Sequence, residues 1–478
     1  MNFDLILRGG TVVTPTFAGP LDVGVQGEQI AAVAAPGTLP ADGATLLDTS
    51  GKIVLPGGIE PHAHIATRVN VEWAGAPNVY TQSPEAASRA ALFGGVTTIV
   101  DFAPPGRPSA AGLRPSIVDD VAVRRAVFDG HSYADYTFHY ILAGDVPQET
   151  IDGIQAAVDS GIASFKVFTT FGRTRVPYGR LADVCAVVAE QGGILAVHAE
   201  EDEIVERTRT RLIAEGNDAG YNLPLVHSNL SEDVAFRAVI RIARYHGAGV
   251  YFVHTTASEG VDAIAEARAD GLPVYGEALH HYLHFTGDDY RKPEGTAIHT
   301  YPALKSAADR DALIAGLMDG RLSTTATDEY TTSKAVKLSG QTLETVCGGH
   351  NGIETRVPVA FTKLVQERGM TLNRFADVVA SNAARILGMY PRKGAIQPGS
   401  DADFTVLDPN LQRTITLDDL HADSDYSIWE GFECRGYPVT TVLRGKIVVD
   451  DGKLLGDAGD GRWLERRIDP AILAGPAL

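Results

Sequence analysis

The sequence is poor in cysteine. Only Cys185, Cys347 and Cys434 occur in 478 residues, an odd number spread widely along the chain. This arrangement fits neither a disulfide framework nor a CxxC-type zinc site, and it is typical of proteins of the reducing cytosol. We therefore expect a cytoplasmic protein.

Membrane and nucleic-acid signals are also missing. No apolar run approaches the roughly 20 residues that cross a bilayer, and the N-terminus lacks the charged and apolar regions of a signal peptide. A net charge of −19 without basic patches argues against nucleic acid and anionic membranes as partners. The composition is globular, and the length suggests one large domain with a smaller companion. The partner that we expect is a small-molecule substrate.

Both ends of the chain contain short β-type runs. Three lie in the first 55 residues, separated by turn residues such as Gly9-Gly10, and Asp403–Leu407 and Thr440–Val449 look similar near the C-terminus. This pattern predicts a small β-sandwich built from both termini. We assign residues 1–55 and 392–478 to the sandwich and C-terminal segment, and residues 56–391 to a central domain.

The central domain alternates between two patterns. Eight apolar, β-branched runs recur, at 58–60, 97–102, 136–142, 164–168, 194–197, 250–253, 273–277 and 322–327. Helical patterns lie between them, at 84–93, 116–128, 150–160, 181–191, 232–245, 258–269 and 308–318. The alternation predicts a parallel (β/α)8 TIM barrel. An open doubly wound sheet is the alternative, but it favours a GxGxxG turn, which Gly57-Gly58 does not provide.

Several side chains able to bind a metal or move a proton lie at or near the ends of these runs. They are His62, His64, Lys166, His198, His254 and Asp328. Each alone has a structural explanation, as a packed histidine, a paired lysine or a helix-capping aspartate. In a barrel, however, the C-terminal strand ends converge on one mouth, where active sites occur. Together the six predict one site.

The residue types in this set suggest a metal centre. His62 and His64, two apart on an extended segment, point the same way, and imidazole suits zinc and related divalent metals. Lys166 does not fit as an ammonium beside dications. A desolvated lysine can become a neutral amine and add carbon dioxide. The resulting anionic carbamate could bridge two metals about 3.5–4 Å apart, as in two-metal hydrolytic sites.

The sequence resembles the dihydropyrimidinase and hydantoinase family, the cyclic amide hydrolases of the amidohydrolase superfamily. The resemblance covers nearly the whole chain, with motifs in a specific order and spacing. The matching stretches are Leu55-Pro-Gly-Gly-Ile-Glu-Pro-His-Ala-His64, Gly94-Gly-Val-Thr-Thr-Ile-Val-Asp-Phe102, Ser164-Phe-Lys-Val-Phe168, Val197-His-Ala-Glu200, Val253-His-Thr-Thr256, Ala326-Thr-Asp328 and Ser381-Asn-Ala-Ala-Arg-Ile-Leu-Gly388. It implies two metal ions, commonly Zn²⁺, and commonly a homotetramer.

The resemblance also implies a role for each residue. His62, His64 and Asp328 would hold the first metal, His198 and His254 the second, and carbamylated Lys166 would bridge both. A hydroxide between the metals would attack the amide carbonyl. Asp328 would take the proton of this hydroxide and pass it to the departing nitrogen. The implied reaction opens a hydantoin or dihydropyrimidine ring.

The substrate shell departs from the family pattern. Family members usually carry an oxyanion-stabilising tyrosine where this chain has Phe171, and a phenyl ring donates no hydrogen bond. Thr300 and Asn351 correspond to loops whose backbone binds the ring amide. His280, His281 and His284 stand where relatives have a Cys-Pro-Gln-Tyr type run, and either substrate contact (His281) or packing explains them.

Three alternatives stay open at this point. A divergent member would act on another cyclic imide or on an acyclic amide or urea. A non-catalytic family member is expected to have lost its ligands, whereas all six positions are present here. A mononuclear deaminase of the superfamily would need no bridging lysine.

Overall fold

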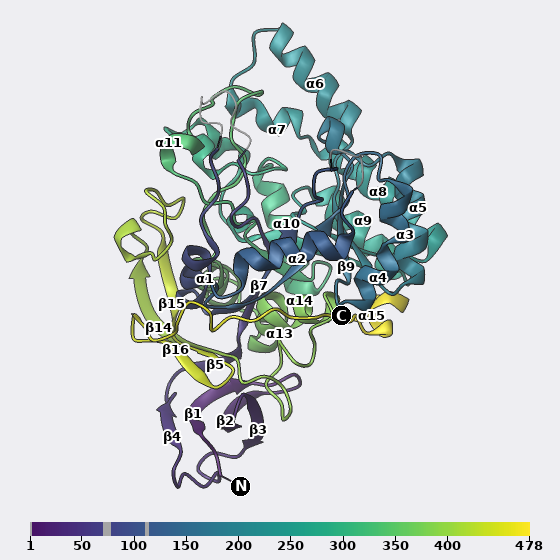
Figure 1. The fold of residues 1–478 in the computed structure, drawn as a ribbon. Helices are drawn as coiled ribbons and strands as arrows, with labels where there is room; N and C mark the ends of the chain where they lie inside the picture. Colours follow the sequence, from purple (N-terminus) through teal and green to yellow (C-terminus); the bar gives the residue numbers. More distant parts are fainter. Residues whose placement is uncertain (1, 70–77, 110–113) are drawn as a thin grey trace.

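The central part of the chain forms a parallel barrel. The computed structural model describes residues 2–69, 78–109 and 114–478 (Figure 1). The barrel strands are β6 (Gly58–Ala63), β7 (Val96–Ala103), β8 (Asp135–Ile141), β9 (Ser164–Phe168), β10 (Ile194–His198), β11 (Gly249–Phe252), β12 (Val274–Leu279) and β13 (Thr324–Ala326). They are hydrogen-bonded in chain order, each parallel to the next.

The barrel is nearly closed between its first and last strands. Just beyond β13, the amide of Glu329 donates to the carbonyl of His62 (3.2 Å), and the amide of His64 donates to the carbonyl of Glu329 (2.8 Å). Ala63 and Glu329 therefore form a parallel bridge. An open doubly wound sheet has no such connection between its edges, so the (β/α)8 prediction is confirmed.

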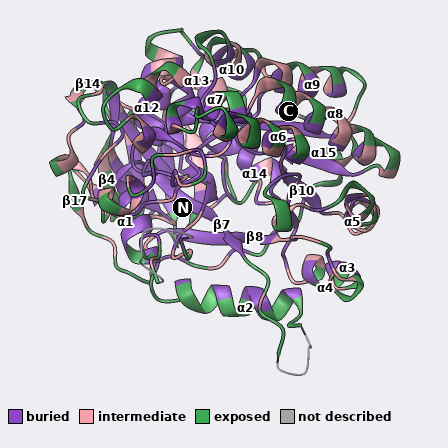
Figure 2. Cartoon of the chain, turned by 90° about the horizontal axis from the view of Figure 1, so that it is seen from above, coloured by how far each residue is buried: buried purple, intermediate pink, exposed green. Residues whose placement is uncertain are grey.

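Helices follow the barrel strands and cover them from outside. They are α1 (Pro84–Phe93), α2 (Ile117–Phe128), α3 (Gln148–Asp152), α4 (Ile154–Asp159), α5 (Tyr178–Glu190), α6 (Asp202–Ala214), α7 (Leu223–Val226), α8 (Asn229–His246), α9 (Ser258–Ala269) and α10 (Ala307–Asp319). Figure 2 shows buried strands inside and exposed outer faces on helices such as α2. Among the described residues, no helix is both long and apolar enough to cross a membrane.

Local sequence explains some of these helix boundaries. Ser116 caps α2 in a reciprocal pair with Asp119, as the predicted start at residue 116 requires. The predicted helices at 84–93 and 258–269 match α1 and α9. The predicted helix at 150–160 is instead two helices, because Gly153 ends α3 and precedes α4.

Shorter helices follow the barrel. They are α11 (Lys334–Lys337), α12 (Arg356–Ala360), α13 (Leu372–Ala376), α14 (Asn382–Ile386) and α15 (Pro470–Ala474). Residues 361–366 and 377–381 are π-helical and continue α12 and α13. Sequence periodicity did not predict these π-helical stretches, which are rare in proteins.

The two termini build a separate sheet of nine strands. They are β1 (Leu5–Val13), β2 (Ala18–Gln26), β3 (Gln29–Ala34), β4 (Thr45–Asp48), β5 (Ile53–Pro56), β14 (Phe404–Thr414), β15 (Glu433–Leu443), β16 (Lys446–Asp450) and β17 (Lys453–Leu454). β5 lies between β1 and β14 and so joins the two ends of the chain. One cluster of buried apolar side chains contains residues from both ends of the chain. The prediction that both termini form one small β unit is confirmed.

Gly57 connects this sheet to the barrel. β5 ends at Pro56 and β6 begins at Gly58. A Cβ atom at Gly57 would lie 2.2 Å from the hydroxyl oxygen of Thr97, so only glycine fits the close approach. The domain boundaries at 55/56 and 391/392 stay a prediction.

A buried lysine connects the terminal sheet to the base of the barrel. The Lys393 ammonium lies 2.6 Å from carboxylate oxygens of Asp135 and Asp403 and 2.9 Å from one of Asp401. Burial alone would lower the pKa of Lys393, but Asp135 and Asp403 outweigh it and raise that pKa above its ordinary value. The lysine is therefore charged and neutralises a buried acidic cluster.

We expect Lys393→Met to lower the free energy of unfolding by about 3–5 kcal/mol, because it removes the buried cation of Asp403 and one of the two cations, with Arg444, that pair with Asp135. Urea denaturation followed by circular dichroism measures the change. Lys334→Met is the matched control. It breaks an exposed pair with Glu294 (2.7 Å) and should cost no more than about 1 kcal/mol. An equal loss in both variants would contradict the argument.

Candidate metal centre and active-site cavity

A cavity of about 340 Å³ opens where the barrel strands end. Its lining includes the six side chains that the sequence singled out: His62, His64, Lys166, His198, His254 and Asp328. They come from β6, β9, β10, β11 and β13 or from the residues directly after these strands. The chain order of the motifs becomes proximity in space because parallel strands present their C-terminal ends on one face.

His62, His64 and Asp328 form a compact group of possible metal ligands. Asp328 Oδ1 lies 3.1 Å from His62 Nε2 and 3.2 Å from His64 Nε2. One ligand atom from each of the three lies within 4.8 Å of the others. Among the described residues, the buried His62 Nε2 has no hydrogen-bond partner. A buried ring nitrogen without a partner, next to a second histidine and a carboxylate, fits the binding of a divalent cation.

Two of the six residues, His254 and Asp328, have a strained backbone conformation. Asp328 has φ of 54° and His254 has φ of 40°, in the left-handed region that non-glycine residues rarely adopt. Such conformations persist where the surrounding structure enforces them, commonly at functional sites. Here they turn the chain at the strand end, and both side chains line the cavity.

Glu277 on β12 supports this group from below. Its Oε1 lies 2.9 Å from His62 Nδ1 and accepts from the amide of His254 at 3.0 Å, while Oε2 accepts from the Tyr251 hydroxyl at 2.6 Å. A carboxylate only accepts, so His62 Nδ1 carries a proton, and Nε2 is the nitrogen left to bind a metal ion. Sequence analysis missed Glu277, although a lone acidic residue inside an apolar strand is a usable signal.

The charges around His62 favour a cation. Burial lowers the pKa of His62, but Asp328 and Glu277 outweigh it and raise that pKa to about 9. Burial raises the pKa of Asp328, but His62 and His64 hold it well below its usual value. Asp328 is therefore an ionised carboxylate at neutral pH, and the group attracts positive charge.

Lys166 lies in a desolvated position beside these groups. Lys166 is 1% exposed, and its ammonium lies 5.3 Å from the Phe102 ring centre and 5.0 Å from that of Phe168. Among the described residues, no carboxylate lies within ion-pair distance of it. Burial lowers the pKa of Lys166 to about 8. A fraction of this lysine is therefore a neutral amine near neutral pH.

The rings of the two remaining histidines of the set, His198 and His254, pack against each other in the cavity lining. The ring centres of His198 and His254 lie 4.4 Å apart, and that of His254 lies 5.3 Å from that of His62. Burial lowers the pKa of His254 well below its usual value, so it is neutral and able to bind a metal.

Thr300 also lines the cavity and contacts Asp328. Its hydroxyl donates to Asp328 Oδ2 at 2.8 Å, while Oδ1 faces His62 and His64. The two carboxylate oxygens thus have different partners, and the Thr300 bond fixes the orientation of the carboxylate. The sequence comparison with the family placed Thr300 in a substrate-binding loop; its side-chain contact with Asp328 is additional.

We expect Thr300→Val, which keeps the side-chain volume, to lower kcat by about 10-fold or more, because a hydrogen bond to a charged group contributes about 1.5–3 kcal/mol. The lost bond stabilised the carboxylate form, so the pKa of Asp328 should rise. The acidic limb of the pH profile of kcat/KM should then move to higher pH. Thr300→Ser keeps the hydroxyl and should leave the limb in place. If the acidic limb of the kcat/KM profile does not move in Thr300→Val, Thr300 does not influence the pKa of Asp328.

Phe171 occupies the wall of the cavity next to His198. Its ring centre lies 4.7 Å from that of His198, and its side chain is 37% exposed. The hydroxyl of the nearby Tyr178 donates to Glu201 at 2.6 Å, and Tyr178 is not among the residues around the cavity. Phe171 itself cannot donate the hydrogen bond that the family tyrosine is expected to donate from this position.

The other substrate contacts expected from the sequence lie outside the cavity lining. The Asn351 side chain donates to the Ser424 hydroxyl (2.9 Å) and to the Tyr426 carbonyl. His281 is fully buried, 3.0 Å from His350, and His280 accepts from Trp429. Their side chains support packing at the barrel mouth. Substrate contact through the Asn351 loop backbone or through His281 stays a prediction.

Comparisons with known proteins agree with this geometry. The model of the amidohydrolase family matches residues 53–448, and the chain belongs to this family. It is 32% identical to D-hydantoinases of Ralstonia pickettii and Rhizobium radiobacter, with 97% of this chain and 99% of each relative covered. The crystal structure of dihydropyrimidinase from Brevibacillus agri NCHU1002 superposes with a TM-score of 0.90, at 29% identity, over 97% of this chain and 98% of that one. The family resemblance is confirmed.

Proposed function

We propose that this protein is a metal-dependent hydrolase that opens a cyclic amide or ureide ring of the hydantoin or dihydropyrimidine type. The observation that carries the proposal is the group of His62, His64 and Asp328 at the floor of a cavity that Lys166, His198 and His254 also line. The hydantoinase and dihydropyrimidinase names of the similar proteins support the substrate class.

We infer a centre of two divalent ions, Zn²⁺ being the first candidate. His62, His64 and Asp328 would hold one ion and His198 and His254 the other, with Lys166, as a carbamate, between them. The low pKa of Lys166, about 8, favours addition of carbon dioxide to its amine. Bound ions of this kind lower the pKa of water to about 7 and polarise a carbonyl oxygen.

The side chains of the protein would supply binding and proton transfer. Asp328 is ionised, oriented by Thr300 and faces the cavity, so it can take a proton from an attacking water and return it to the leaving nitrogen. A cavity of about 340 Å³ falls in the size range of small-molecule sites and can take a five- or six-membered ring with a substituent.

Phe171 favours a second candidate, a divergent amidohydrolase acting on another cyclic imide or on an acyclic amide or urea. Without the family hydroxyl at this position, the developing oxyanion would depend on the metals, on backbone amides and on other side chains of the cavity. Substrates whose oxyanion needs less stabilisation would then be preferred.

A substrate screen with metal analysis tests the proposal. Hydantoins, dihydrouracil, cyclic imides, allantoin, lactams and acyclic amides are incubated with purified protein, and ring opening is followed by absorbance and mass spectrometry. We expect close to two metal ions per chain and fastest turnover of a hydantoin or dihydropyrimidine. Preference for an acyclic amide would support the second candidate, and a metal-free chain inactive on every substrate would refute both. A cytoplasmic location and a homotetramer are further parts of this proposal, the latter tested by light scattering.

A further inference from the structure

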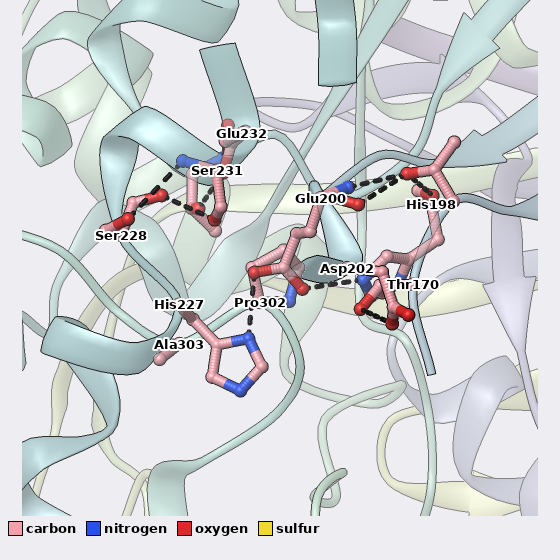
Figure 3. Close-up of polar contacts among 12 residues, drawn as sticks. Thr170, His198, Glu200, Asp202, His227, Ser228, Ser231, Glu232, Pro302 and Ala303 are labelled. Carbon is pink, nitrogen blue, oxygen red and sulfur yellow. Dashed lines mark hydrogen bonds and ion pairs between the residues drawn. The ribbon is translucent and has the colours of Figure 1, made fainter. Parts of the chain in front are cut away.

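A buried carboxylate joins His198 to a histidine outside the predicted site. Glu200 Oε2 lies 2.8 Å from His198 Nε2, and Glu200 Oε1 lies 2.8 Å from Nδ1 of His227, which follows α7. All three side chains are buried. Figure 3 shows Glu200 with the His227 ring pointing at its carboxylate. An ionised carboxylate only accepts hydrogen bonds, so both histidines donate to it.

The backbone of Glu200 is fixed from two sides. The Thr169 hydroxyl, at the end of β9, donates to the carbonyl of Glu200 at 2.7 Å and accepts from its amide at 2.9 Å. The next amide, that of Glu201, donates to the carbonyl of Ser231 in α8 at 2.8 Å. The carboxylate is therefore held in place before any ligand arrives, and its orientation does not depend on a metal.

This geometry settles which nitrogen of His198 can bind a metal. Because Nε2 carries a proton and donates to Glu200, only Nδ1 has a free lone pair. The arrangement repeats that of His62, whose Nδ1 donates to Glu277 while Nε2 faces Asp328 in the proposed metal site. Histidine ligands of metals commonly donate their other N–H to a carboxylate, which fixes the tautomer and ring orientation.

We propose that Glu200 is the positioning residue of the second metal ion, fixing His198 in the tautomer that presents Nδ1 to the cavity, with His227 orienting the carboxylate from its far side. The inference rests on the proposed binuclear centre and assigns each half of it one supporting carboxylate, Glu277 for His62 and Glu200 for His198. Removing the charge of Glu200 should then weaken one ion selectively.

The test is zinc binding to Glu200→Gln, measured by competition with a chromophoric chelator. We expect affinity for one of the two ions to fall about 10–100-fold, as for other partners of metal-binding histidines, while the other ion keeps its affinity. Activity should return as excess zinc is added, which a misfolded variant would not show. Glu203→Gln, an exposed residue of α6, is the matched control and should bind both ions as the wild type does.

A second measurement does not depend on a variant. In metal-free wild-type protein labelled with ¹⁵N-histidine, the His198 signals should show protonated Nε2 and unprotonated Nδ1. The opposite tautomer, or unchanged affinity for both ions in Glu200→Gln, would overturn the inference while leaving the binuclear centre standing. Wild-type protein with fewer than two ions per chain would instead remove the proposed function and this inference with it.

Discussion

Lys166→Ala should lower kcat by at least about 100-fold, the scale of losing one strong electrostatic contribution to the transition state. The variant removes the group that we place between the two metal ions, and no other described lysine or arginine lines the cavity. The side chain is buried beside Phe102 and Phe168, so alanine should leave an apolar gap next to these rings. Steady-state kinetics together with metal content measures the effect.

Short carboxylic acids provide the sharpest control for this variant. Formate or acetate fits the space of the lost side chain and can supply the two oxygens of a carbamate, so added acid should restore part of the activity. Lys292→Ala, at an exposed lysine, should neither lose activity nor respond to acid. Full activity and full metal content in Lys166→Ala would exclude the binuclear mechanism and favour a mononuclear centre.

The position of the candidate metal ligands could be predicted from sequence because it depends on simple rules. Each ligand lies at or beside the end of a strand, and strand ends in a barrel meet on one face whatever the details of the loops. His62 and Asp328 therefore needed only a correct strand assignment to be placed together. The alternation of strands and helices, which is strongly periodic, provided that assignment.

The carboxylates behind the ligands could not be predicted in the same way. The pairing of Glu277 with His62 joins residues 215 positions apart, and no local pattern encodes it. Glu200 carried a weak signal, since residues two apart on extended backbone point the same way. His227 carried none, because its place depends on how α7 meets α8. The hydrogen-bond partners of these histidines can therefore be identified only once the packing of the elements is known.

The substrate shell was hardest to predict because it lies on loops. Asn351 matches the family motif, but its side chain donates hydrogen bonds to Ser424 and Tyr426 of the C-terminal segment. His281 is likewise turned toward His350 rather than the cavity. Loop conformation is set by contacts with distant segments, so motif matches there identify a segment without fixing where its side chains point.

Asp328→Asn should lower kcat by about 10²–10⁴-fold, the contribution of a well-placed general acid or base. Asparagine keeps the shape of the side chain and can still accept from Thr300, so the cavity should be unchanged. It cannot take up a proton at neutral pH, and the transfer from water to the leaving nitrogen loses its carrier.

The measurement must separate this proton role from loss of a metal ligand. We expect Asp328→Asn protein, supplied with excess zinc, to hold both ions and still turn over slowly, because His62 and His64 keep their positions. Asp311→Asn, at an exposed aspartate, should behave as wild type. Excess zinc that restores the rate of Asp328→Asn would show that the carboxylate serves only as a ligand. The proton would then need another carrier, and among the residues placed around the cavity the only other carboxylate is that of Glu344.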